Sequence, residues 1–129
     1  MDLCNPIGPE QNTAPCANDS TRRIATASNV WTADTPTEEQ RAAWIANLDK
    51  IAGRNPSVVI PGHMDPAAPT GLAAIEHTKA YLLNFEEELA KGGDSVALKA
   101  ALEARFPNLG MGVALDIGSK VATGEMKCG

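Results

Sequence analysis

A long amphipathic pattern constrains the fold of this chain more than any other feature of its sequence. It runs from Gly71 to Lys91, and apolar or small side chains return every three or four residues along it. That spacing places them on one face of an α-helix. The members of this face are Leu72, Ile75, Thr78, Leu82, Phe85 and Leu89. Gly92 and Gly93 end the pattern, so we predict a long helix that buries one face.

Two further helices are predicted from their start and stop signals. Thr37 is followed three residues later by Gln40, which is the spacing of a capping box, and the helix that starts there ends near Gly53. Asp94 or Ser95 caps the next helix, which continues to the residue before Pro107.

Two segments have the composition of strands. Residues 23–31 contain β-branched and aromatic side chains, and residues 57–60 read as a short buried strand that ends at a Pro-Gly turn. We therefore predict an α/β domain, helix-dominated with a small sheet, over residues 21–129. Residues 1–20 are crowded with turn-forming residues and lack periodicity, which predicts an irregular N-terminal arm.

Composition excludes several classes of partner. The chain has 129 residues, a length typical of one domain, and 11 basic against 16 acidic residues give a net charge of −5. A negative chain is a poor ligand for phosphate backbones, so we expect no nucleic-acid partner. No apolar run is long enough for a membrane span, and the first residues lack the basic start and apolar region of a signal peptide, so we expect none. Three cysteines are too few for a secreted disulfide framework, which favours reduced thiols and a cytoplasmic location.

His63 is the strongest candidate for a metal-binding or catalytic residue. It follows the predicted strand and the turn Pro61-Gly62, and ligands collect at such strand ends in open sheets. An imidazole there can bind zinc, act as a general base, or be a hydrogen-bonded turn residue. Asp65 could orient its ring and complete a small-ligand site, although a carboxylate before Pro66 is more typical of a turn cap.

Several ordered segments resemble the C-terminal half of metallo-β-lactamase-fold hydrolases, over about residues 30–127. The segments are Val30-Trp31-Thr32-Ala33-Asp34-Thr35-Pro36, Trp44, Leu48, Ile51, Asn55-Pro56-Ser57-Val58-Val59-Ile60-Pro61-Gly62-His63, Tyr81-Leu82, Arg105-Phe106-Pro107, Leu115-Asp116-Ile117-Gly118 and Gly124-Glu125-Met126-Lys127. The resemblance implies half of an αββα sandwich, and it favours a helix over a strand for the ambiguous residues 111–121. It also implies a two-zinc centre whose metal-bound hydroxide attacks an ester, thioester, amide or phosphoester. His63 is the position that would inherit a ligand of the second zinc.

The chain departs from that family at the metal ligands. The His-x-His-x-Asp-His cluster is absent, and the two histidines of the chain are His63 and His77. His77 matches no family ligand, and Asp19 is a weak match for the bridging aspartate. A catalytic zinc ion needs about three protein ligands. We therefore expect no cofactor in the isolated chain, with zinc as the one possible metal.

Three interpretations of the function follow. The chain is a fragment of a longer hydrolase, a truncated relative with a new role, or an enzyme with a rebuilt site. We favour a relative that is not catalytic alone and acts by self-association or small-ligand binding, with His63 at the mouth of any cleft. The alternative is a zinc-dependent hydrolase whose site, using His63, Asp65 or Asp19, is completed across a subunit boundary. Half a sandwich leaves a sheet edge and an apolar face uncovered, so we expect a homo-oligomer, most simply a symmetric dimer.

Overall fold

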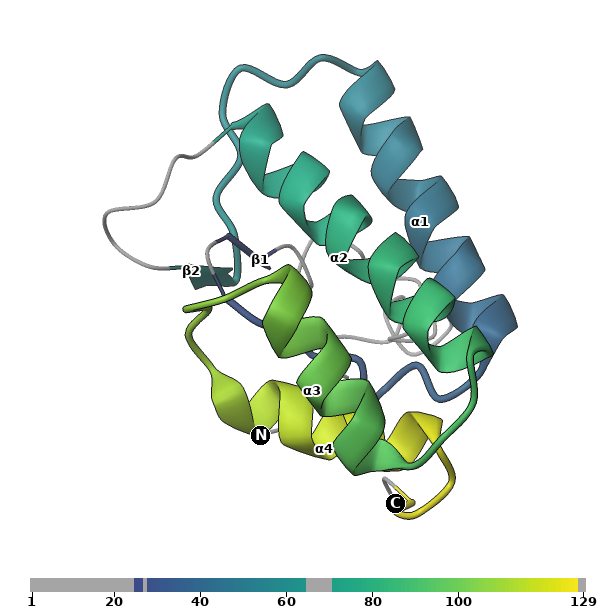
Figure 1. Cartoon of the computed structure of the whole chain (residues 1–129). Coiled ribbons are helices and arrows are strands. Elements are labelled where there is room, and N and C mark those ends of the chain that lie inside the picture. The colour runs from purple at the N-terminus through teal and green to yellow at the C-terminus, as the bar shows by residue number, and fades with distance from the viewer. Residues whose placement is uncertain (1–24, 27, 65–70, 128–129) are drawn as a thin grey trace.

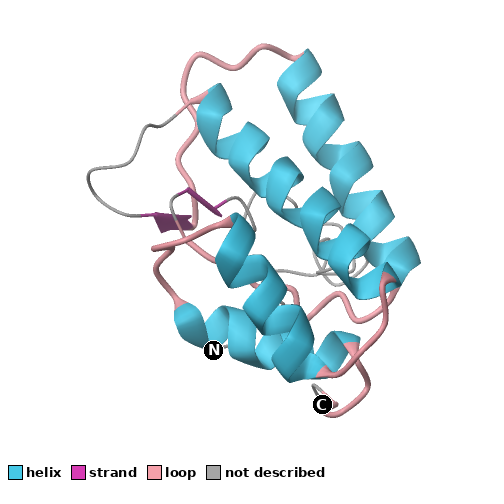
Figure 2. Ribbon diagram, viewed as in Figure 1, coloured by secondary structure: helices cyan, strands magenta, loops and turns pink. Residues whose placement is uncertain are grey.

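The described part of the chain, in a computed structural model, comprises residues 25–26, 28–64 and 71–127. It is built around four helices (Figures 1 and 2). In chain order the elements are β1 (Ala25–Thr26), α1 (Glu38–Gly53), β2 (His63–Met64), α2 (Leu72–Ala90), α3 (Ser95–Arg105) and α4 (Gly112–Ala122). The predicted N-terminal arm, residues 1–20, lies outside the described residues.

Helix α1 begins as its sequence predicts. The Gln40 amide donates to the Thr37 hydroxyl over 3.2 Å, and the Thr37 amide donates to the Gln40 side chain over 3.1 Å. This reciprocal pair is the predicted capping box. Glu38 and Glu39 occupy the first turn, where the helix dipole favours negative charge. The buried face of α1 carries Trp44 and Leu48, which anchor it to the rest of the core.

Helix α2 is the central element and contacts α1, α3 and β1. Its predicted apolar face is buried at Ile75, Thr78, Leu82 and Phe85, with Tyr81 beside them. Figure 1 shows α1 and α2 running next to each other, with α3 and α4 at the other side of α2. Burial of these large side chains, at about 1.5–3 kcal/mol each, is the main force that holds the helices together.

The two C-terminal helices are also found where the sequence predicts them. Asp94 caps α3, because its carboxylate accepts the amide of Ala97 over 2.9 Å. The ambiguous residues 111–121 are helical, as α4. Gly118 lets α4 approach the segment before α1 closely, since a Cβ atom at this position would collide with the side chain of Thr32. This contact fixes α4 against the start of the domain.

The predicted small sheet is wrong. β1 and β2 are two residues each and pair in parallel, Ala25 with His63 and Thr26 with Met64, which is too little to form a layer of sheet. The described part is therefore a helical fold rather than an α/β domain or half of an αββα sandwich. Residues 57–60 have no regular secondary structure and are not a buried strand: Val59 is buried, whereas Val58 and Ile60 are 71% and 78% exposed.

The physical reason for this error lies in how the core is filled. A run of β-branched residues indicates a strand only if neighbouring strands cover it. Here the described core is made mainly by side chains from the helices, to which the non-helical segments add Val30 and Val59. Residues 28–31 behave similarly. Beyond β1 they form an isolated bridge from Ser28 to Gly110 in place of a continuing ladder.

Candidate functional site

The structure places the backbone of His63 at the start of β2, opposite Ala25 of β1. The strand predicted at residues 57–60 is absent, so His63 does not follow the end of a strand but begins a two-residue one. Asp65 and Asp19, the other two predicted site residues, lie outside the described residues. The predicted grouping of these three side chains therefore stays a prediction.

A buried polar network lies just beyond β1. The Tyr81 hydroxyl donates to the side-chain oxygen of Asn29 over 3.0 Å. The Asn29 amide groups, side chain and backbone, both donate to the carbonyl of Gly110, over 3.0 and 2.9 Å. Burial raises the pKa of Tyr81, against a smaller opposing effect of a backbone hydrogen bond at Val30. The phenol therefore stays protonated and serves as a hydrogen-bond donor that joins α2 to the segment before α1.

His77 supports the same segment. Its Nε2 lies 3.0 Å from the carbonyl oxygen of Ser28. Because a carbonyl only accepts, this nitrogen carries the hydrogen and donates it. The ring also meets Phe106 edge-on, with centroids 6.1 Å apart. In the part of the chain that the structure describes, no three His, Cys, Asp or Glu side chains are grouped so that they could hold a metal ion.

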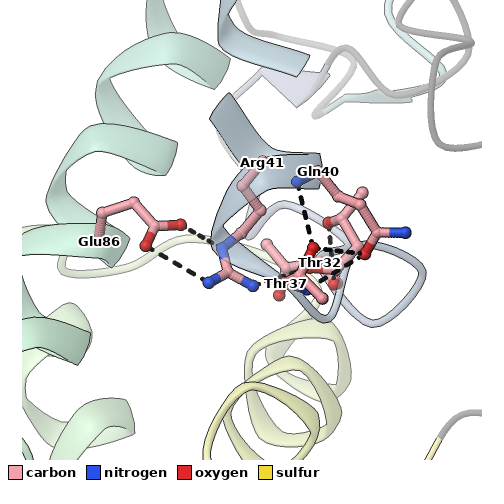
Figure 3. Close-up of polar contacts among 6 residues, drawn as sticks. Thr32, Thr37, Gln40, Arg41 and Glu86 are labelled. Atoms are coloured by element: carbon pink, nitrogen blue, oxygen red, sulfur yellow. Dashed lines mark hydrogen bonds and ion pairs between the residues drawn. The ribbon is translucent and has the colours of Figure 1, made fainter. Parts of the chain in front are cut away.

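A second polar site, which the sequence analysis missed, joins α1 to α2. Arg41 of α1 is 2% exposed, and its Nε and Nη2 donate to the two carboxylate oxygens of Glu86 on α2 (Figure 3). Its Nη1 donates to the carbonyl of Thr35 over 2.8 Å. The guanidinium also lies 5.4 Å from the centre of the Phe85 ring. The buried cation is thus satisfied by an ion pair, a carbonyl and an aromatic face.

One sequence signal could have identified Arg41. It stands three residues before Trp44 and seven before Leu48, which puts it on the buried face of α1. A charged residue on an apolar helical face is rarely buried without a partner. The identity of that partner is a long-range fact, since Glu86 follows 45 residues later.

A cavity adjoins this ion pair where α1 begins and α2 ends. It has a volume of about 260 Å³ and is lined by Glu38, Glu86, Leu89 and Ala90. Two glutamates and two aliphatic residues therefore line it. This is a different place from β2, where the sequence analysis expected a cleft.

An apolar surface lies at the opposite end of α2. Val58 and Ile60 are exposed, Leu72 is 36% exposed, and the amide of Gly71 donates to the carbonyl of Val59 over 3.5 Å. Figure 1 shows the segment that carries Val58 and Ile60 passing beside the first turn of α2. Residues 55–75 contain no Lys or Arg and a single carboxylate, Asp65. We call the surface formed by Val58, Ile60 and Leu72 the uncharged end.

No family model, no curated protein and no solved structure matches this chain. Among the described helices, none combines the length and the apolar character needed to cross a membrane.

Proposed function

We propose that this chain is a truncated relative of metallo-β-lactamase-fold hydrolases that has no hydrolase activity alone and acts, in the cytoplasm, by associating with a second copy of itself. The observation that carries the proposal is the uncharged end, where Val58, Ile60 and Leu72 are exposed and Val59 accepts a hydrogen bond from Gly71. The kinship rests on the ordered sequence segments between residues 30 and 127.

The ligand inventory supports the absence of family activity. A catalytic zinc ion takes about three protein ligands and keeps one open position, and a two-zinc centre needs more. The chain has two histidines, and one of them, His77, donates its Nε2 hydrogen to the carbonyl of Ser28. His63 is left as the one histidine at a position where the family binds metal.

The charge distribution supports self-association over the uncharged end. Two copies with a net charge of −5 repel each other, and the repulsion is largest where charged surfaces meet. The sequence around Val58, Ile60 and Leu72 carries almost no charge, so two copies can approach there at the lowest electrostatic cost. Burying an exposed Val or Ile contributes about 1.5–3 kcal/mol to the free energy of association. In a two-fold symmetric dimer each such residue is buried once in each copy, so it contributes twice.

The oligomeric state of a double variant tests this interface. Light scattering at micromolar concentration should give a dimer for the wild type and a monomer for Val58→Thr combined with Ile60→Thr. Val96→Thr is the matched control, because Val96 is 73% exposed but lies in the first turn of α3. The control should remain dimeric. A monomeric wild type, or a double variant that stays dimeric, would contradict the proposal.

Metal analysis tests the proposed loss of hydrolase activity. Purified wild-type protein should hold less than stoichiometric zinc, and added zinc should leave its melting temperature unchanged, because one histidine is too weak a site to shift folding. Stoichiometric zinc that disappears in His63→Ala would instead support the alternative, a hydrolase site completed between subunits.

A further inference from the structure

We propose that two copies of this chain join through their backbones, with residues 57–60 of one copy pairing with residues 57–60 of the other as short antiparallel strands. This inference rests on the proposed self-association at the uncharged end. It adds which groups hold the two copies together and in which register they meet.

The first step concerns the side chains of this segment. Val58 and Ile60 are exposed, whereas Val59 between them is 7% exposed. This alternation has the two-residue period of a strand with one buried face. Val and Ile are also residues that favour strands. The segment thus has the side-chain pattern of a strand, although in the described part of the chain no strand pairs with it.

The second step concerns the backbone. The carbonyl of Val59 accepts the amide of Gly71, the N-cap residue of α2, so it points towards that helix. Successive residues of a strand direct their backbone groups to opposite edges, so those of Val58 and Ile60 point away from Gly71. Among the described residues, neither Val58 nor Ile60 has a backbone hydrogen-bond partner. The edge that carries their amides and carbonyls is the one a second copy can use.

The third step concerns the register. A two-fold axis through Val59 places Val58 of each copy opposite Ile60 of the other. In this register each Val58–Ile60 pair exchanges both of its hydrogen bonds, and exposed β-branched side chains lie opposite each other. Pro56 and Pro61 have no amide hydrogen, so they end the paired segment on both sides.

Pairing of this kind gives a closed dimer. Gly71 already occupies the other edge at Val59, so the paired segment offers no edge to a third copy. Residues 55–75 contain no Lys or Arg, so an ion pair within this region cannot set the geometry. Hydrogen bonds that replace bonds to water add little net free energy. The exposed apolar side chains therefore drive the association, and the backbone fixes how the copies are aligned.

Amide hydrogen exchange of the full chain, resolved to single residues by mass spectrometry, tests the pairing. At a concentration where light scattering gives a dimer, the amides of Val58 and Ile60 should exchange about tenfold more slowly than in a sample diluted to the monomer. The amide of Val59 is the control. It points to the opposite edge and should exchange at the same rate in both samples.

Two variants at position 60 separate backbone pairing from side-chain contact. Ile60→Pro keeps an apolar side chain, but its ring takes the place of the N–H and blocks the approach of the partner strand, so it should be monomeric at micromolar concentration. Ile60→Leu is the matched control, because it keeps the amide and an apolar side chain, and it should remain dimeric. Circular dichroism checks that both variants are folded. If Ile60→Pro does not fold, the exchange measurement alone decides.

The outcomes distinguish this inference from the proposal on which it rests. A monomeric wild type would refute self-association and the strand pairing together. A wild-type dimer whose Val58 and Ile60 amides exchange as fast as in the monomer, or a folded Ile60→Pro variant that still dimerises, would leave self-association standing and overturn the strand pairing.

Discussion

At the scale of single residues, Arg41 departs most from what its residue type predicts. Long cationic side chains are almost never fully buried unless they are paired. Arg41 is buried because Glu86 and the carbonyl of Thr35 replace the water that it loses. Such pairs are weak evidence for net stability, but removing one partner is costly. The ion pair itself therefore adds little to the free energy of unfolding, but a substitution that removes Arg41 alone should lower that free energy considerably.

Replacing Arg41 with Leu should destabilise the fold by about 2–3 kcal/mol. This is below the ~3–5 kcal/mol typical of a broken buried pair, because Glu86 is 24% exposed and regains some water. Urea denaturation would measure the change. The control is Lys79→Ala, which breaks an exposed ion pair with Asp49 and should cost less than about 1 kcal/mol. Equal losses in the two variants would show that Arg41 has no special role.

At the scale of elements, the turn that follows α4 holds the start of α3. The Glu125 carboxylate accepts the Ser95 amide over 2.6 Å and the Ser95 hydroxyl over 3.0 Å, and the Thr123 hydroxyl donates to it over 2.6 Å. One carboxylate thus satisfies donors at a helix N-terminus, where negative charge is favoured. The two C-terminal helices are joined by this contact as well as by their packing.

These hydrogen bonds, the one from Thr123 first and those from Ser95 next, hold the pKa of Glu125 below its ordinary value of 4.5. A depressed folded-state pKa stabilises the fold above the unfolded value and loses that contribution as the pH falls through the folded value. Glu125→Gln should therefore lower stability at pH 7, and the difference from wild type should shrink as the pH falls below 4.5. Urea midpoints from pH 7 down to pH 3 would measure it. A gap that stays constant with pH would refute the assignment.

At the scale of the whole molecule, local signals predicted the helices well and long-range packing was predicted poorly. The cap at Thr37 and the end at Gly53 depend on residues within one or two turns, so α1 could be placed from the sequence. Val58 and Ile60 are β-branched residues, which are typical of strands, so the sequence predicted a buried strand there. Whether such residues are buried depends on which other elements cover them. The Arg41–Glu86 site was missed for the same reason, since its residues meet only after α1 and α2 have packed.

Helix α2 sets the distance between the uncharged end and the cavity that Glu38, Glu86, Leu89 and Ala90 line. Leu72 and Ala90, its first and last residues, are 18 steps of 1.5 Å apart, which separates them by about 27 Å along the axis. The helix keeps this separation fixed. Uncharged residues lie at its N-terminal end, and the Arg41–Glu86 ion pair lies near its C-terminal end. A fluorophore at one tip would consequently sit beyond the Debye length of charges at the other in ordinary buffer. Association of two copies at the uncharged end would therefore leave the signal of a fluorophore at the cavity end unchanged.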